Sequence, residues 1–150
     1  MKKLFICLVA ATIVFGITGC EKVASYKEGV YEASVIDNYN NENNTATAKI
    51  TIDKDGKIKE VYLDTTYVKD GEKTTKKTLK DNYNMKKYTP NAAGEWYEQV
   101  EKLEKAIVEN QGLDFLNLNA DGKTDAVSGC TIKIDALYNA AKEALEKASK

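Results

Sequence analysis

A two-residue alternation of apolar and polar positions marks the first half of the chain. Ala46–Ile52 alternates in this way, which is the pattern of a half-buried antiparallel strand. Asp55-Gly56 supplies a turn, and Ile58–Leu63 returns as the partner strand. Val30–Ile36 is rich in β-branched and aromatic residues and predicts a further strand, which the polar stretch 37–44 joins to the hairpin as a loop.

The second half of the chain follows a helical period. After Gly94, apolar residues recur at i, i+4, i+7 and i+11 and form one stripe of a helix: Trp96, Val100, Leu103 and Ile107. Trp96 could also serve as a stacking platform for an aromatic ligand, although its spacing is more typical of a core residue. Glutamates crowd the first turns, where the helix dipole favours acids, and Gly112 marks the expected end.

The final segment predicts a second helix, from about Ile134 to Ala148. Its apolar stripe contains small residues that permit close packing: Leu137, Ala140, Ala141, Ala144, Leu145 and Ala148. Between the strands and these helices, Lys73–Lys87 is lysine-rich and only weakly periodic, so we expect a helix or a partly ordered crossing there. Strands that precede helices, without an internal repeat, indicate a single α+β domain with a small antiparallel sheet followed by packed C-terminal helices.

The N-terminal residues have the pattern of a targeting signal. Two lysines precede an apolar run from Leu4 to Ile17, which is shorter than the span of about 20 residues that a transmembrane helix needs. The run ends in Ile17-Thr18-Gly19-Cys20, which resembles a lipobox, the motif whose cysteine is diacylated before the signal is cleaved. We expect residues 1–19 to be a lipoprotein signal peptide and Cys20 to carry membrane lipid on the extracytoplasmic face. An uncleaved N-terminal anchor is the alternative.

Composition excludes several classes of function. The chain has 22 Lys+Arg, all of them lysine, 23 Asp+Glu and no histidine. The lack of histidine excludes a Ser-His-Asp or Cys-His nucleophile and leaves too few ligands for a zinc site. The lack of arginine and a formal net charge of −1 argue against a nucleic-acid binder. With Cys7 in the signal and Cys20 lipidated, Cys130 would stand alone, so no internal disulfide can form.

The segment Asp121–Ile134 carries the candidate chemistry. It is a polar, glycine-containing stretch that leads Ser128, Gly129 and Thr131 to the start of the last predicted helix. Backbone N–H groups and the positive end of the helix dipole collect at such a position and favour an anion, and Lys133 supplies a positive charge. The residues alone leave a second interpretation open, in which Ser128 or Thr131 only caps the helix.

A resemblance to a known family favours the first interpretation. Asp125-Ala126-Val127-Ser128-Gly129-Cys130-Thr131 closely resembles Asp-x-x-Ser/Thr-Gly-Ala-Thr, the flavinylation signature of FMN-binding domains. Such domains occur in the C subunit of the sodium-pumping quinone reductase and in many small surface lipoproteins. Glu28–Tyr31, the predicted hairpin and Trp96–Gln99 resemble other elements of the family, so the resemblance covers most of Tyr26–Ala148. Cys130 stands where the family has alanine.

In that family the last threonine of the motif carries FMN through a phosphoester bond, which a separate FAD-dependent flavin transferase forms. The resemblance therefore implies FMN as the cofactor and a binding site made of the following residues: Thr131 as the covalent attachment point, with Asp125, Ser128, Gly129, Cys130 and Ile132. Cys130 as a redox thiol or a thioether flavin site is a competing interpretation, which the lack of a partner cysteine disfavours.

These observations predict three regions and one function. Residues 1–19 form the signal peptide, 20–26 the lipidated N-terminus with a short tether, and 27–150 the FMN-binding domain. We expect a membrane-anchored redox carrier, without a substrate of its own, that takes part in extracellular electron transfer. It would accept electrons from a membrane quinone or flavoprotein donor and pass them to an outer acceptor. The alternative is a non-flavinylated binding or structural surface lipoprotein of the same fold.

Overall fold

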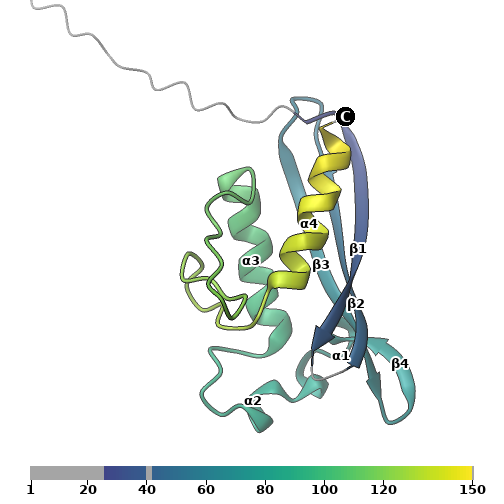
Figure 1. Cartoon of the computed structure of the whole chain (residues 1–150), viewed down its shortest axis with the longest axis vertical. Helices are drawn as coiled ribbons and strands as arrows, with labels where there is room; N and C mark the ends of the chain where they lie inside the picture. Colours follow the sequence, from purple (N-terminus) through teal and green to yellow (C-terminus); the bar gives the residue numbers. More distant parts are fainter. Residues whose placement is uncertain (1–25, 40–41, 150) are drawn as a thin grey trace, which may run out of the picture.

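The computed structural model describes residues 26–39 and 42–149. The predicted signal peptide and Cys20 lie outside the described residues. Four antiparallel strands form a sheet in the order β1-β2-β3-β4, and the helices α3 and α4 lie against one of its faces (Figure 1). The architecture is therefore the predicted α+β fold, with a sheet layer and a helix layer.

The sheet is a meander whose strands follow one another in the chain: β1 (Gly29–Tyr39), β2 (Glu42–Ile52), β3 (Ile58–Lys69) and β4 (Glu72–Thr75). Alternate residues of β2 are buried, as the two-residue period predicts: Ala46, Ala48, Ile50 and Ile52. The predicted turn between β2 and β3 is confirmed. There the Asp53 carboxylate accepts hydrogen bonds from the backbone N–H groups of Asp55 and Lys57, both at 2.9 Å.

The loop that the sequence predicted over residues 37–44 is largely wrong. β1 and β2 continue to pair until Tyr39 lies opposite Glu42. β3 likewise runs past its predicted end at Leu63 to Lys69, where it pairs with β4. A hydrogen-bonded ladder does not require apolar side chains, so polar residues can continue a hairpin whose register the buried residues have already set.

The lysine-rich segment is neither one helix nor an irregular crossing. After β4 it forms three short helical turns: α1 (Lys76–Leu79), η1 (Lys80–Tyr83) and α2 (Met85–Tyr88). Lys80 and Asn84 have φ values of 48° and 59°, which no continuous α-helix can contain. The Glu95 carboxylate then accepts hydrogen bonds from the backbone N–H groups of Met85 and Lys86, which fixes the start of α2.

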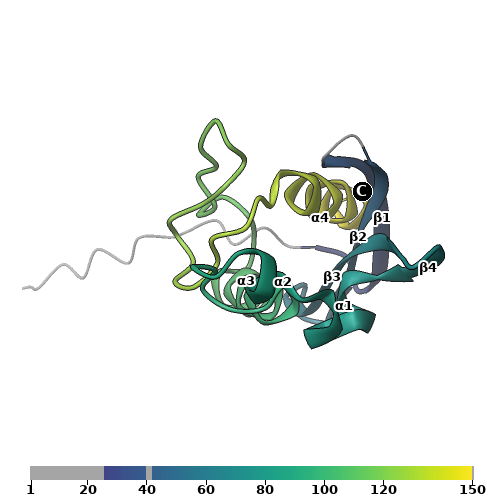
Figure 2. The ribbon, with the colours of Figure 1, turned by 90° about the horizontal axis from the view of Figure 1, so that it is seen from below.

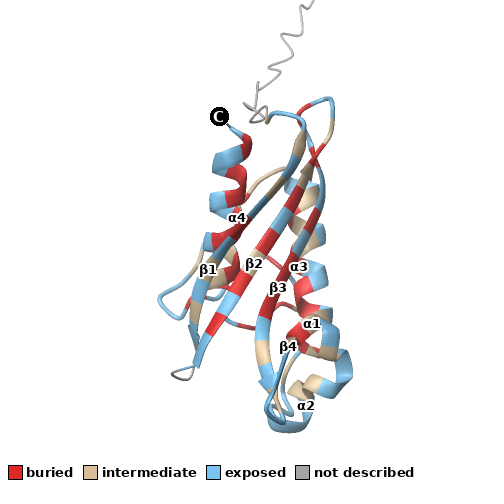
Figure 3. Cartoon of the chain, turned by 90° about the vertical axis from the view of Figure 1, so that its right-hand side faces the viewer, coloured by how far each residue is buried: buried red, intermediate tan, exposed pale blue. Residues whose placement is uncertain are grey.

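The two long helices are close to their predicted positions. α3 spans Trp96–Asn110 and begins with a capping box between Glu95 and Glu98. α4 spans Asp135–Ala148. The predicted apolar stripe of each helix is buried. α3 packs on β3, and α4 packs on β1 and β2 (Figures 1 and 2). Figure 3 shows the resulting bands of buried residues along the strands.

Four alanines of α4 are fully buried, Ala140, Ala141, Ala144 and Ala148, which lets this helix approach the sheet closely. None of the helices in the described part of the chain has the length and apolar character needed to cross a bilayer. The hydrophobic core lies between the sheet and the two long helices, α3 and α4.

Candidate functional site

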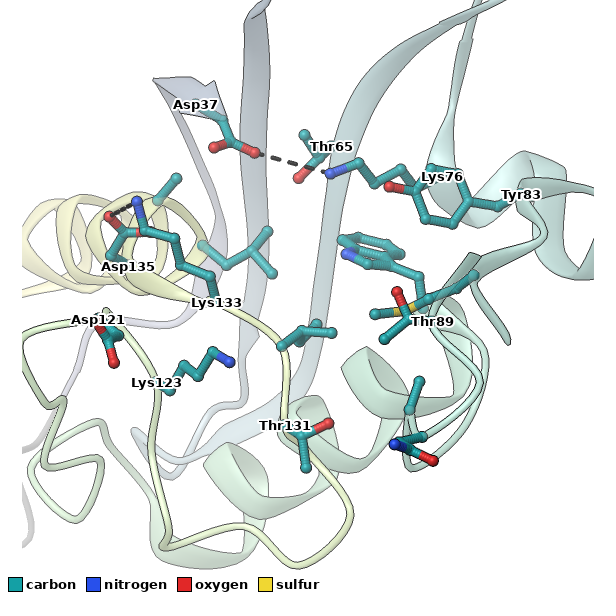
Figure 4. A pocket seen from close by; sticks show the side chains of 17 residues that line it. Asp37, Thr65, Lys76, Tyr83, Thr89, Asp121, Lys123, Thr131, Lys133 and Asp135 are labelled. Carbon is teal, nitrogen blue, oxygen red and sulfur yellow. Dashed lines mark ion pairs between the residues drawn. The ribbon is translucent and has the colours of Figure 1, made fainter. Parts of the chain in front are cut away.

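A cavity of about 570 Å³ opens between the short helical turns, the start of α3 and the loop that precedes α4 (Figure 4). Small-molecule sites typically occupy about 300–1,000 Å³. Part of the wall is apolar: Met85, Trp96, Ile132 and Leu137. The polar part carries charges of both signs and one hydroxyl of interest: Asp37, Lys76, Lys123, Thr131, Lys133 and Asp135. The cavity therefore has the size and the mixed lining of a ligand site.

The predicted site residues divide into two groups. Thr131 and Ile132 line the cavity. Asp125 and Ser128 are exposed on the loop that leads to them, Gly129 is half-buried and Cys130 is buried; these four residues are not part of the cavity wall. The structure thus brings the end of the motif to the cavity and leaves its beginning on the surface.

The beginning of the motif forms a tight turn. The backbone N–H of Cys130 donates to the carbonyl of Val127 at 3.1 Å, which closes a four-residue β-turn. Gly129 is the third residue of this turn and has a φ of +76°. A type II turn needs a positive φ at its third position, which glycine adopts without strain. The turn presents Ser128 on the surface, three residues before Thr131.

Thr131 is exposed, but its backbone N–H and its hydroxyl both form hydrogen bonds with a buried side chain of α3. Its backbone N–H donates to Gln99 Oε1 at 2.8 Å and its hydroxyl donates to the same oxygen at 3.1 Å. Gln99 lies on α3 with no exposed surface, and its Nε2 donates to the Gly94 carbonyl at 2.8 Å. The hydroxyl therefore has a fixed partner in the core while its side chain faces the cavity.

The interpretation of Ser128 or Thr131 as a helix cap is wrong. The N-cap of α4 is Ile134, which makes no side-chain capping bond. The first turn of α4 lines the cavity through Asp135, Ala136 and Leu137, so backbone N–H groups at the positive end of a helix border the site. Lys133 pairs with Asp135 at 3.1 Å.

Lys76 brings a further positive charge to the cavity, which the sequence did not reveal. Its Nζ lies 4.0 Å from a carboxylate oxygen of Asp37, and both side chains are largely buried. The same nitrogen lies 5.3 Å from the centre of the Trp96 ring and 5.7 Å from that of Tyr83, a distance at which a cation attracts an aromatic ring. Burial lowers the pKa of Lys76, and the carboxylate of Asp37 opposes this shift.

Trp96 is a core residue that also borders the cavity. It is 5% exposed and packs in the core, as its spacing predicted. Its ring centre lies 5.3 Å from the Lys76 ammonium, which also lines the cavity. An aromatic wall next to a buried cation suits a flat ligand that carries hydrogen-bond acceptors or negative charge.

Cys130 does not have the properties of a reactive thiol. It is a free, buried cysteine, and burial raises the pKa of its thiol to about 11. The thiolate is the reactive form of cysteine, and at neutral pH almost none is present at such a pKa. The competing interpretation of Cys130 as a redox thiol therefore loses its chemical basis.

Comparisons with known proteins agree with the motif. A family model described as the FMN-binding domain matches residues 43–146. A solution NMR structure of a protein from Clostridium thermocellum is similar, with a TM-score of 0.55 and 34% sequence identity; the match covers 83% of this chain and 93% of that chain. Among curated proteins, none matches this chain.

Proposed function

This chain belongs to the FMN-binding domain family, and we propose that it carries electrons through an FMN attached covalently to Thr131. It is a flavin-binding protein with FMN as its cofactor. Covalent attachment, anchoring to the membrane through Cys20 and electron transfer outside the cytoplasm are the parts that we propose.

The observation that carries the proposal is the position of one hydroxyl. Thr131 lies at the wall of a cavity of about 570 Å³, and it is the motif residue to which the family attaches FMN. The other residues present fit the cofactor. Trp96 and Leu137 offer an apolar wall for a planar ring, and the first turn of α4 with Lys133 offers a positive border for a phosphodiester.

The attachment is a phosphoryl transfer in which the chain supplies only the nucleophile. Thr131 Oγ1 forms a bond to the phosphorus on the riboflavin side of FAD, and the bond from this phosphorus to the bridging oxygen breaks. AMP leaves with the electron pair of that bond, and the hydroxyl proton passes to a base on the flavin transferase. The chain contains no histidine that could serve as this base, which agrees with catalysis by a separate enzyme. The mass of the chain rises by one FMN less one water.

Once bound, FMN supplies the redox chemistry, and the protein supplies attachment, orientation and local electrostatics. Lys76 is the residue best placed to act on charge in the cavity, because its side chain is buried and its ammonium lies at the cavity wall, 4.0 Å from a carboxylate oxygen of Asp37. Trp96 and Ile132 exclude water from the wall beside it.

The position of the cavity supports transfer away from the membrane. At the start of the domain, the backbone N–H of Lys27 donates to the Ala148 carbonyl at 2.9 Å, at the end of α4 that is remote from the cavity. β1 runs from Gly29 to the cavity residue Asp37, which at about 3.3 Å per residue is about 25 Å. Figure 1 shows the start of β1 and the end of α4 at the same end of the domain. A domain held to lipid by its N-terminus would therefore direct the opposite end, which carries the cavity, outward, where an outer acceptor can reach it.

The proposal is tested by co-expressing the exported chain with an FAD-dependent flavin transferase. A covalent flavin leaves a fluorescent band in a gel after denaturation, and peptide mass spectrometry assigns it to a residue. A chain without a covalent flavin, in a host where the transferase modifies a control domain, would favour the alternative, a non-flavinylated binding or structural lipoprotein.

Anchoring gives a separate prediction. Cys20 is the last residue of the lipobox-like Ile17-Thr18-Gly19-Cys20. Cys20→Ala should prevent lipidation and signal cleavage, because the free thiol is the group that accepts the diacylglycerol and the diacylated cysteine is what the cleavage step requires. Fractionation and N-terminal mass analysis should then show an unprocessed chain without diacylglycerol. A wild-type chain that begins at another residue, or carries no lipid, would contradict the lipoprotein assignment.

Cys130 gives a prediction that separates the flavin carrier from a thiol oxidoreductase. Cys130→Ala restores the residue that the family has at this position, and it should leave flavin incorporation unchanged. Loss of the small buried sulfhydryl should cost about 1 kcal/mol of unfolding free energy. The measurement is the ratio of flavin to protein, with electron transfer to an artificial acceptor. Loss of electron transfer in a variant that is fully loaded with flavin would reinstate a redox role for the thiol.

A further inference from the structure

We infer that Gln99 is the positioning residue for the Thr131 acceptor hydroxyl, and that it directs the oxygen lone pairs toward the incoming phosphorus. This inference rests on the proposed attachment of FMN to Thr131. Gln99 and Thr131 are 32 residues apart in the sequence, and they meet because α3 passes directly beneath the loop before α4 (Figure 1).

The orientation of the carboxamide follows from its partners. Nε2 lies 2.8 Å from the Gly94 carbonyl oxygen, which can only accept, so this end of the amide must be the nitrogen. Oε1 therefore faces Thr131 and accepts two hydrogen bonds, one from the backbone N–H and one from the hydroxyl. The two bonds together fix both the backbone and the side chain of the acceptor residue.

This arrangement assigns a direction to each part of the hydroxyl. Before the reaction its proton points toward Gln99 Oε1 at 3.1 Å, and its lone pairs face outward. As the bond from Oγ1 to phosphorus forms, the proton leaves this hydrogen bond and passes to the base on the transferase. Thr131 is exposed, so those lone pairs are accessible to a phosphorus brought by the transferase. The β-branched side chain has few rotamers, and the bond to Gln99 selects one of them. A nucleophile held in its reactive geometry needs less reorganisation on the way to the transition state.

A merely structural role accounts poorly for this residue. Gln99 has no exposed surface and is surrounded by the apolar stripe of α3, where an apolar side chain would pack without the cost of desolvating an amide. At its other end, α3 has a second glutamine with a structural function. Gln111 bonds the backbone of Ile58, accepting from its N–H at 2.8 Å and donating to its carbonyl at 2.9 Å. Gln111 thus provides a matched control far from the motif.

The test compares Gln99→Met, Gln99→Glu and Gln111→Met in the otherwise unchanged exported chain. Each purified apo domain is mixed with flavin transferase and FAD, and its mass is followed over time; thermal unfolding is measured in parallel. Methionine keeps the shape of the side chain without an acceptor. We expect Gln99→Met to lower the maximal rate of flavin attachment by about tenfold to hundredfold, with the KM for the domain little changed because the exposed recognition surface remains.

The other two variants should keep a near-normal rate of flavin attachment but lose stability. Glutamate keeps an acceptor for both Thr131 bonds, so Gln99→Glu should be modified within about threefold of the wild-type rate. It should nevertheless unfold at a lower temperature than the wild type, because it places a carboxylate in the core. Gln111→Met should also lower the unfolding temperature, yet leave the rate of attachment unchanged. The order of the variants by unfolding temperature would then differ from their order by attachment rate.

The outcomes separate this inference from the proposed function. Equal rates for the wild type and a folded Gln99→Met would overturn the role of Gln99 alone. If Gln99→Met does not fold, Gln99→Glu decides: a near-normal rate supports the inference, and a loss of tenfold or more in the folded variant overturns it. A wild-type domain that stays unmodified beside a modified control domain would overturn the proposed attachment and this inference with it.

Discussion

Replacing Thr131 by valine should abolish covalent flavin while leaving the domain folded. Valine has the shape of threonine but no oxygen that could bond to phosphorus. The residue is exposed, and its backbone N–H keeps its bond to Gln99. Loss of the single hydroxyl bond to Gln99 should therefore change the unfolding free energy by about 1 kcal/mol or less. In-gel flavin fluorescence after denaturation measures the first effect, and thermal unfolding of the apo domain measures the second.

Thr131→Ser is the matched variant for this experiment. It keeps a hydroxyl that can reach Gln99, but it lacks the methyl group that restricts the rotamer. Partial incorporation is therefore expected, between the wild-type level and none. A flavin that persists in Thr131→Val, mapped by peptide mass spectrometry to another residue, would show that the attachment point is wrong. Electron transfer to an artificial acceptor should fall in proportion to the covalent flavin.

The elements that bury apolar side chains were predictable from the sequence. The alternation over Ala46–Ile52 and the stripe from Trp96 to Ile107 both coincide with buried faces in the structure. Burial of apolar surface is the largest favourable term in folding and imposes a period on the residues involved. Where an element buries little apolar surface, its sequence shows no regular spacing of apolar residues. This is why the polar continuation of β1 and β2 beyond Ile36 resembled a loop.

The lysine-rich segment, residues 73–87, shows a different limit of prediction from sequence. Its many lysines look alike in the sequence, yet Lys76 is 7% exposed and contacts Trp96 and Tyr83. What singles it out is the position of its partners on other elements, including Asp37 on β1. Local propensity contains no information on such long-range pairs.

The sequence singled out Thr131 as a candidate site residue, but it did not reveal which residue supports it. The motif identified Thr131 and Ile132, both of which line the cavity, because the resemblance was concentrated there. Gln99 drew attention only as part of the Trp96–Gln99 segment that resembles an element of the family, with no role assigned. One signal was available: a glutamine directly before Val100, on the side of α3 that the apolar stripe buries. A polar residue in such a place must have a partner, but only the fold shows which.

Replacing Gly129 by valine should reduce flavin incorporation more than it reduces stability. The backbone of Gly129 has a φ of +76°, a region that costs a residue with a side chain about 1–2 kcal/mol and is least tolerated by β-branched residues. A Cβ at this position would also lie 2.6 Å from Lys102 Nζ, although a flexible lysine can move aside. The turn would relieve the strain by changing shape two residues before Thr131, which displaces the surface that a transferase must recognise. Mass spectrometry and thermal unfolding measure the two losses.

Gly71→Val is the control that separates strain from recognition. Gly71 lies in the turn between β3 and β4 with a φ of +85°, and a Cβ added there meets nothing within 4 Å. The same substitution should thus impose a similar backbone cost of about 1–2 kcal/mol at a position away from the motif. We expect Gly71→Val to lose stability and keep full flavin incorporation. If the two variants lost incorporation equally, in proportion to their unfolded fractions, Gly129 would be a structural turn residue and nothing more. Loss confined to Gly129→Val would instead make the shape of the turn at Val127–Cys130 part of what the transferase reads.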